Sequence, residues 1–154
     1  GFENATYDVI VFTDGDGQFD FSEVDGFIEG IENNDLVIGY RKKRRDNLVR
    51  HILMNMLKMW DYIFFGFNFK DIDCGFKMFK RSALLELLPF RSEGAMITTE
   101  ILAKAVKKGL KINQVEVTHH PRQFGKQSGA NFAVIIRAVL ESLILWWDIR
   151  NKRI

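Results

Sequence analysis

The chain has 154 residues, of which 47% are hydrophobic and 27% are charged, and its formal net charge is +2. These values are those of a single globular domain with a core of its own, and they exclude a disordered chain. The one cysteine, Cys74, excludes an internal disulfide and favours a reducing compartment, which places the protein on the cytoplasmic side.

The first predicted element is a strand over residues 8–13, whose β-branched and aromatic residues favour burial in a sheet. Two carboxylates, Asp14 and Asp16, follow it directly. Hard divalent cations prefer carboxylate oxygens, and ligands of open α/β sheets bind at the carboxyl ends of the strands. The sequence therefore predicts a metal site at this edge. Because Asp-Gly pairs also form turns, a turn-capping role for Asp14 is the alternative.

The segment from Asp14 to Glu23 also matches most of the loop of an EF-hand, including the glycine at its bend, Gly17. Two features count against a calcium loop. The first ligand position falls on Phe12, which has no side-chain oxygen, and the preceding residues predict a strand where an EF-hand has a helix. An EF-hand-like calcium-binding or membrane-peripheral module is therefore the alternative from a different functional class.

Further strands are predicted by apolar runs and alternation, and helices by the spacing of apolar residues and by breakers such as Pro89 and Gly109. The predicted strands cover residues 8–13, 35–39, 75–80 and 112–118. The predicted helices cover residues 21–32, 48–64, 82–88, 98–108 and 131–149. Strands that alternate with helices indicate an α/β domain.

The last predicted helix has a wide apolar face and an opposite charged face. Charges interrupt it too often for it to cross a bilayer. Trp146 and Trp147, followed by basic residues, are typical of a helix that lies in a membrane interface with its aromatic rings at headgroup depth. Packing against the core of the domain is the alternative. The basic run at 41–45 likewise suits phosphate groups or an anionic membrane surface, and a solvated loop is its alternative.

Four motifs occur in order along the chain. They are Asp14-Gly15-Asp16-Gly17-Gln18, the strand end at 37–41, the segment 71–77 with Asp71, Cys74, Gly75 and Phe76, and the loop at 119–128. Together they resemble the second half of family-two glycosyltransferases of the GT-A fold, in the polyprenyl-phosphate branch that includes dolichyl-phosphate mannose synthase and dolichyl-phosphate glucosyltransferase. The resemblance implies a mixed sheet flanked by helices. It divides the chain into a partial GT-A catalytic domain at residues 1–129 and a terminal amphipathic helix at residues 130–154.

The resemblance also implies that this sequence is one part of a larger domain. The opening strands of the family, which bind the nucleoside of the donor, have no counterpart in it, and the sequence starts at Gly1 rather than Met. We therefore expect a fragment that is inactive on its own.

On the donor side, the resemblance implies a nucleotide-sugar linked to UDP or GDP. The residues that would hold Mg²⁺ or Mn²⁺ against its diphosphate are Asp14, Asp16 and Gln18. The residues of a loop that would close over the diphosphate are Arg122, Gly125, Lys126 and Ser128. Glycine permits close approach of the backbone there, and the cationic side chains compensate the charge of the diphosphate.

On the acceptor side, the resemblance implies a polyprenyl phosphate. Arg41 and Arg50 would bind its phosphate, since a guanidinium offers paired donors and stays charged. The carboxylates assigned to catalysis are Asp71, Asp73 and Glu100. A phosphate is already anionic and needs no general base. A saccharide hydroxyl, the alternative acceptor, would need Asp71 or Asp73 to take its proton.

Other motif residues have structural interpretations. Cys74 is expected to be a small packed residue and not a nucleophile. Glu100 has an ion pair with Lys104 on the helix surface as its structural alternative. His119 and His120 are adjacent on an extended segment, so their side chains point to opposite faces, and we expect one to be packed and the other exposed.

The predicted function is metal-dependent transfer of a hexose from a nucleotide-sugar to a polyprenyl phosphate, with inversion at the anomeric carbon. The predicted location is the cytoplasmic face of a membrane, where the protein is peripheral or is anchored by segments outside this sequence. We expect no nucleic-acid partner.

Overall fold

The computed structural model describes residues 1–41, 48–92, 96–121 and 132–151, with the side chains at 48–54, 57, 58 and 132–135 outside the description. In chain order the elements are η1 (Phe2–Asn4), β1 (Val9–Phe12), η2 (Phe21–Glu23), α1 (Val24–Ile31), β2 (Leu36–Arg41), α2 (Leu48–Phe65), β3 (Lys77–Lys80), α3 (Arg81–Leu87), α4 (Ile97–Lys107), β4 (Ile112–Val117) and α5 (Phe132–Arg150). Each predicted strand and helix is present within a few residues of its expected bounds.

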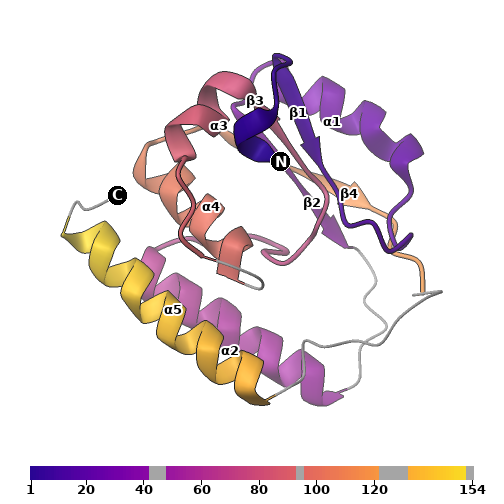
Figure 1. Cartoon of the computed structure of the whole chain (residues 1–154). Coiled ribbons are helices and arrows are strands. Elements are labelled where there is room, and N and C mark those ends of the chain that lie inside the picture. Colours follow the sequence, from indigo (N-terminus) through magenta and orange to yellow (C-terminus); the bar gives the residue numbers. More distant parts are fainter. Residues whose placement is uncertain (42–47, 93–95, 122–131, 152–154) are drawn as a thin grey trace.

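The described strands form one mixed sheet in the order β1-β3-β2-β4. Strands β2 and β4 pair in parallel, whereas β3 pairs antiparallel with both β1 and β2. Strands β1, β2 and β4 therefore run in one direction, and their carboxyl ends share one edge with the start of β3 (Figure 1). This edge is where ligands bind in open α/β sheets.

Alternating side chains bury the sheet on both faces. In β2, Leu36 and Ile38 belong to a cluster with Ile101 of α4, while Val37 belongs to a second cluster with Phe27 of α1. Helix α1 thus covers one face of the sheet, and α3 and α4 cover the other (Figure 1). The strand ends are held by a core on each side and form a rigid base for the site.

Helices α2 and α5 lie side by side below the sheet (Figure 1). The indole nitrogen of Trp60 donates a hydrogen bond to Ser142 at 2.9 Å, and the rings of Phe64 and Trp146 pack edge to face with centroids 5.6 Å apart. From the first contact to the second, the chain advances four residues along α2 and also four residues along α5. The two helices therefore run parallel.

The apolar face predicted for the last helix points outward. Ile144 is 62% exposed and Trp147 is 54% exposed, whereas Ser142, Leu145 and Asp148 are buried. Helix α5 does pack on the core, as the alternative has it, but through a different stripe that contains Leu145 and Ile149. No helix in the described part of the chain combines the length and apolar character of a membrane span.

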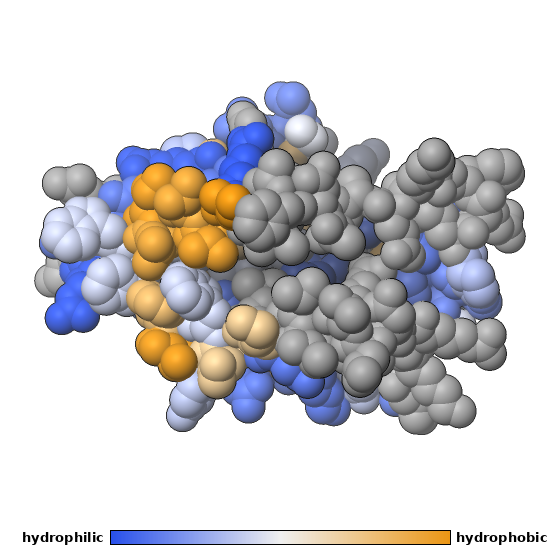
Figure 2. Space-filling model, turned by 90° about the horizontal axis from the view of Figure 1, so that it is seen from below, coloured by the Kyte–Doolittle hydropathy of each residue, from blue (hydrophilic) through white to orange (hydrophobic). Residues whose placement is uncertain are grey.

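Helix α2 adds to the same outward surface, which we call the α2–α5 face. Figure 2 shows hydrophobic residues gathered on this side of the molecule. Its described members are Met56, Met59, Tyr62, Ile63, Ile136, Val139, Leu140, Leu143, Ile144 and Trp147. Contiguous apolar surface of this kind on a folded protein indicates an interaction site.

Candidate active site

Asp14 stands at the carboxyl end of β1 and lies directly against Gly75, which precedes β3. A Cβ atom on Gly75 would lie 2.9 Å from Oδ1 of Asp14 and closer still to its Cγ and Oδ2. The position therefore admits only glycine while Asp14 stays in place. The contact joins two of the four sequence motifs at one edge of the sheet.

The loop after β1 is paired with the segment that follows β4. The backbone nitrogen of Gln18 donates to Oδ1 of Asp16 at 3.1 Å, which fixes a tight turn. The side-chain nitrogen of Gln18 donates to the carbonyl of His120 at 3.1 Å, and the backbone nitrogen of His120 donates to the carbonyl of Gln18 at 2.8 Å. The start of the fourth motif therefore lies beside the carboxylate loop.

The two histidines differ in environment as expected. The ring of His119 packs edge to face on Phe19, with centroids 5.3 Å apart, and its backbone forms an isolated β-bridge with the same residue. His120 is exposed. The histidine pair thus contributes one packed and one exposed ring.

The EF-hand alternative is wrong. The element that leads into Asp14 is strand β1, not a helix. Glu23, which would be the last calcium ligand, accepts hydrogen bonds from the backbone nitrogen of Thr118 at 2.9 and 3.2 Å. Asp20 accepts from the backbone nitrogen of Ser22 at 2.9 Å, and hydrogen bonds from the side chain and the backbone of Ser22 lower the pKa of Asp20. The residues of the apparent calcium loop therefore cap η2 and hold β4.

Arg41 and Asp71 form a buried bidentate ion pair. Nε and one terminal nitrogen of Arg41 lie 2.6 and 2.9 Å from the two carboxylate oxygens of Asp71, and the backbone nitrogen of Arg41 donates to Oδ2 at 3.3 Å. Only 8% of the Arg41 side chain and 4% of the Asp71 side chain are exposed. Asp71 therefore orients the guanidinium at the end of β2, and both of its oxygens are already hydrogen-bonded.

Lys77 lies beneath this segment and was not among the predicted site residues. Its ammonium donates hydrogen bonds to the carbonyls of Ile72, at 3.3 Å, and Cys74. Burial lowers the pKa of Lys77, while the nearby negative charges, those of Asp71 and Asp14 among them, oppose that shift. The buried cation thus holds the turn before β3 and balances the carboxylates around it.

Cys74 is a packed residue, as expected. Its thiol is buried and fills the space beside Gly39, where an added Cβ would lie 2.8 Å from Sγ. Burial raises the pKa of the Cys74 thiol to about 11, so the thiol is not a nucleophile at neutral pH.

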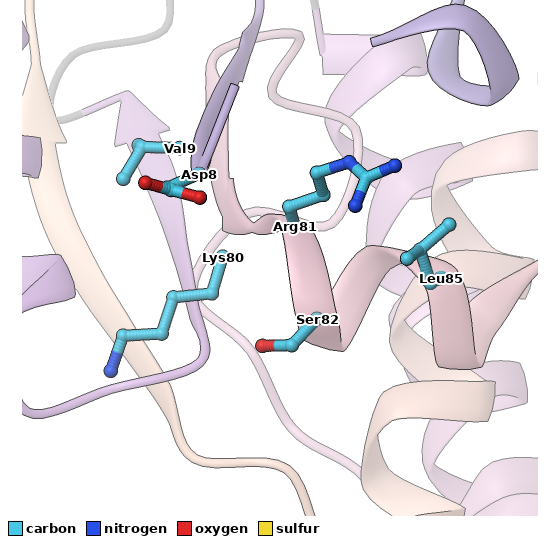
Figure 3. A pocket seen from close by; sticks show the side chains of 6 residues that line it. All are labelled: Asp8, Val9, Lys80, Arg81, Ser82 and Leu85. Carbon is cyan, nitrogen blue, oxygen red and sulfur yellow. The ribbon is translucent and has the colours of Figure 1, made fainter. Parts of the chain in front are cut away.

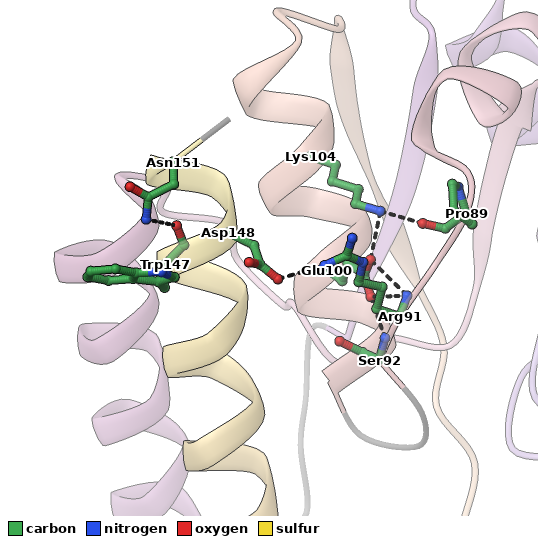
Figure 4. A network of polar contacts seen from close by, with 8 residues as sticks. All are labelled: Pro89, Arg91, Ser92, Glu100, Lys104, Trp147, Asp148 and Asn151. Atoms are coloured by element: carbon green, nitrogen blue, oxygen red, sulfur yellow. Dashed lines mark hydrogen bonds and ion pairs between the residues drawn. The ribbon is translucent and has the colours of Figure 1, made fainter. Parts of the chain in front are cut away.

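Glu100 is the centre of a polar network that ties α4 to the preceding loop (Figure 4). Its carboxylate accepts from the backbone nitrogens of Arg91 and Ser92 and pairs with Lys104 at 2.7 Å. Burial pushes the pKa of Glu100 up, but these hydrogen bonds outweigh it and hold the pKa below its usual range. The pair with Lys104 is buried rather than on the helix surface, and Arg91 continues the network to Asp148 of α5 at 2.8 Å.

Two further carboxylates lie in these segments. Asp73, two residues after Asp71 in the sequence, is exposed. Asp61 of α2 is fully buried, and among the described residues neither of its carboxylate oxygens has a hydrogen-bond partner. The sequence analysis missed Asp61, which is the one acidic residue in the sequence of α2. Its position between Trp60 and Tyr62 was the available signal.

The remaining predicted site residues cannot be placed. Arg50 belongs to α2, but its side chain lies outside the description. The residues that lie wholly outside the described ranges are Arg122, Gly125, Lys126 and Ser128. Their predicted roles stay predictions, as do the catalytic roles of Asp71, Asp73 and Glu100.

A hollow of about 460 Å³ lies at the opposite end of β1 from Asp14 (Figure 3). Its lining residues are Asp8, Val9, Lys80, Arg81, Ser82 and Leu85. It is remote from the strand ends that gather the motifs, so we do not assign it to the active site.

Comparison with known proteins identifies the relatives of this chain. It is 30% identical over 130 residues to the dolichyl-phosphate beta-glucosyltransferase of Saccharomyces cerevisiae, a match that covers 71% of this chain and 39% of that protein. It is 26% identical over 132 residues to the undecaprenyl-phosphate mannosyltransferase of Micrococcus luteus, covering 80% of this chain and 54% of that protein. The chain belongs to the polyprenyl-phosphate glycosyltransferases. The predicted family is confirmed.

Solved structures show that this chain has the fold of a GT-A domain over part of that domain's length. The glucosyl-3-phosphoglycerate synthase of Mycobacterium tuberculosis, crystallised with UDP, matches with a TM-score of 0.69 at 18% identity, covering 94% of this chain and 52% of that one. The predicted mixed α/β sheet is confirmed. No protein-family model matches the chain. The chain spans about two fifths to one half of the length of these relatives.

Asp14 and Asp16 offer oxygen ligands of the kind that a divalent cation prefers. Asp14 is exposed and occupies the space that the missing side chain of Gly75 leaves. Asp16 follows two residues later in the same loop. Among the described residues no group of three or more His, Cys, Asp or Glu side chains is placed to hold a metal. Two carboxylates, with substrate phosphate and water as the other ligands, are a usual arrangement for Mg²⁺. The synthase of Mycobacterium tuberculosis has been crystallised with Mn²⁺ and UDP-glucose.

Proposed function

We propose that the chain is part of an inverting glycosyltransferase that moves a hexose from a UDP- or GDP-linked sugar to a polyprenyl phosphate. The observation that carries the proposal is the convergence of the motifs at one edge of the sheet. There, Asp14 lies against Gly75, Asp71 holds Arg41, and Gln18 is paired with His120. Segments up to 102 residues apart in sequence thus meet where ligands bind in this class of sheet.

On the donor side, Asp14 and Asp16 would hold Mg²⁺ or Mn²⁺ against the diphosphate, with Gln18 as a further ligand. A cation there stabilises the negative charge that the leaving nucleoside diphosphate gains as the sugar departs. The loop with Arg122, Lys126 and Ser128 follows the segment that Gln18 binds through His120. This pairing supports a role for that loop at the diphosphate.

On the acceptor side, Arg41 would bind the phosphate of the lipid, with Arg50 on the following helix. The two hydrogen bonds to the Asp71 carboxylate keep the Arg41 guanidinium in a fixed orientation before the acceptor binds. Both Asp71 oxygens are hydrogen-bonded, and a saccharide hydroxyl would need a carboxylate such as Asp73 to take its proton. The Arg41 guanidinium favours the phosphate acceptor, which needs no base.

The metal assignment is tested by comparing Asp16→Asn with Asp20→Asn. We expect the first to lower turnover roughly 100-fold, because it removes one of two carboxylates from the cation, and the second to leave turnover unchanged, because Asp20 caps η2. Turnover is measured with the upstream segment restored, a panel of nucleotide-sugars, a short-chain prenyl phosphate and Mn²⁺. The proposal fails if the two variants lose activity equally, or if Asp16→Asn keeps it.

We further propose that the α2–α5 face binds a membrane surface. Ile63 and Ile144 are 66% and 62% exposed on it, and the guanidinium of Arg150 stacks on the Trp146 ring at 5.3 Å, near the helix end. An apolar face with aromatic and cationic residues at its border suits the boundary between lipid headgroups and acyl chains. The peripheral location on a membrane is proposed on this ground.

The double variant Ile63→Glu, Ile144→Glu is expected to reduce binding to vesicles with anionic lipid by tenfold or more, on the order of the burial energy of two isoleucines. Ile28→Glu, on the exposed side of α1, is the matched control because Ile28 is 51% exposed but lies away from this face. Co-sedimentation with vesicles measures both. Equal binding by the double variant and the control would rule out the face.

A further inference from the structure

Lys77 is the first residue of β3 and is a fully buried lysine. It pairs with Phe12 of β1 and with Ile38 of β2, and it is 0% exposed. Among the described residues, the acceptors of its ammonium are the backbone carbonyls of Ile72, at 3.3 Å, and Cys74. Lysine is almost never fully buried, because removing its charge from water costs free energy. A lysine at this position therefore has a role beyond packing.

The two carbonyls belong to the turn before β3, residues 71–75, which contacts both halves of the candidate site. At one end of the turn, Asp71 accepts hydrogen bonds of 2.6 and 2.9 Å from the guanidinium of Arg41. At the other end, Gly75 lies directly against Asp14. The carbonyls that accept from the lysine lie between these two contacts in the sequence. The ammonium therefore holds the piece of chain on which both contacts depend.

The turn before β3 also packs tightly on β2. The backbone nitrogen of Gly39 donates to the carbonyl of Phe76 at 2.8 Å. A Cβ atom on Gly39 would lie 2.8 Å from Sγ of Cys74 and 3.0 Å from the same carbonyl oxygen. An apolar residue in place of Lys77 would remove the donor from two carbonyls, and a buried acceptor that loses its donor costs free energy. We expect the turn to rearrange in response and to displace the contacts at both of its ends.

We propose that Lys77 is a positioning residue for both substrates, which holds the turn before β3 in the conformation that places Asp14 and the Arg41–Asp71 pair at one edge of the sheet. The inference rests on the proposed function, because that function assigns Asp14 to the donor and Arg41 to the acceptor. Lys77 is buried and acts through the turn. Its removal should weaken donor and acceptor binding together, although the residues assigned to each substrate are unchanged.

The first test uses the chain without substrate. Lys77→Met keeps the apolar stem of the side chain and removes the ammonium. The backbone amides of Gly39 and Arg41, which donate to Phe76 and Asp71, are expected to exchange with solvent about tenfold faster or more, because both hydrogen bonds depend on the position of the turn. The amides of α4 should keep their rates. Hydrogen–deuterium exchange followed by NMR measures both groups, and unchanged rates at Gly39 and Arg41 overturn the proposal.

Two controls separate this role from a loss of charge and from a loss of stability. Lys80→Met removes an ammonium from the other end of β3, where it donates to the carbonyl of Glu32 at 3.2 Å, and should leave the amides of Gly39 and Arg41 unchanged. Leu84→Ala truncates a core side chain that is 1% exposed, and should accelerate amides throughout the fold. If Lys77→Met accelerates all amides alike, the lysine serves stability alone and the proposal is wrong.

The wild type gives a reading that needs no variant to fold. In a chain with nitrogen-labelled lysine, the Lys77 ammonium should give its own signal near neutral pH, because fixed hydrogen bonds to two buried carbonyls slow the exchange of its protons with water. The signal is assigned through the carbons of the same side chain. If it is absent, the ammonium is not held by the turn, and the proposal is overturned.

The second test addresses the substrates. With the upstream segment restored, Lys77→Met should raise the KM of the nucleotide-sugar and the KM of prenyl phosphate by about tenfold each, because the contacts for both depend on one turn. Leu84→Ala, assayed where it is folded, should leave both KM values unchanged. A rise in only one KM, or in neither, overturns the joint role. Absence of transfer by the wild type overturns the proposed function instead, while hydrogen exchange still decides whether Lys77 holds the turn.

Discussion

Gly75→Ala is expected to lower the turnover of sugar transfer by roughly 100-fold or more. The added methyl would overlap the carboxylate of Asp14, which has to move because the turn before β3 is fixed from below by Lys77. Displacement of a catalytic group by about 1 Å costs on the order of 100-fold in rate. Transfer assays with the upstream segment restored, and Mn²⁺ binding followed by electron paramagnetic resonance, measure the two consequences.

The matched control is Gly26→Ala in α1. A methyl there would meet one methyl group of Val115 at 3.2 Å, a contact that a small side-chain shift relieves, and alanine favours the helix. This variant should keep both transfer and Mn²⁺ affinity. If Gly75→Ala also keeps them, Asp14 does not need its place against Gly75, and its assignment as a metal ligand loses its main structural support.

Local signals explain why the secondary structure could be predicted. The strand at Val9–Phe12 is an apolar run, and α4 ends within two residues of Gly109, which adopts a positive φ of 71°. These features depend on residues close together in sequence. The same holds for the two histidines, because alternation along an extended segment needs no knowledge of the rest of the fold.

The site was predicted less fully, because its decisive contacts join distant segments. The sequence marks both Asp14 and Gly75, but not that one is packed on the other across 61 residues. It marks Asp71 as an acid, but not that Arg41 occupies both of its oxygens. These contacts follow from the antiparallel insertion of β3 between β1 and β2, and residue spacing does not encode that strand order.

The burial of particular side chains was the other property that could not be predicted from the sequence. Glu100, whose structural alternative was an ion pair on the helix surface, is 0% exposed. The periodicity of the apolar stripe of α5 suits a core and a membrane equally well. Its outward direction follows from the hydrogen bond that Trp60 donates to Ser142 and from the ion pair of Asp148 with Arg91. A hydrophobic pattern defines a face but not its partner.

Breaking the Arg41–Asp71 pair has the second large expected effect. Asp71→Leu should lower the free energy of unfolding by about 3–5 kcal/mol, because it leaves the Arg41 guanidinium buried without its counter-ion. Arg41→Met should cost a similar amount for the reverse reason. Urea unfolding of the chain measures both. Arg137→Met is the control, since the Arg137–Glu141 pair is largely exposed and should contribute less than about 1 kcal/mol.

The double variant Arg41→Met, Asp71→Leu separates the structural role of the pair from its role in binding. Apolar side chains of similar volume can replace a buried ion pair without loss of stability, so most of the lost free energy of unfolding should return. Acceptor binding should not return, because no guanidinium is left for the phosphate, and the acceptor KM should stay raised about tenfold or more while that of the nucleotide-sugar is unchanged. If the double variant regains the acceptor KM of the wild type along with its stability, Arg41 serves only to hold the end of β2, and the acceptor phosphate binds elsewhere.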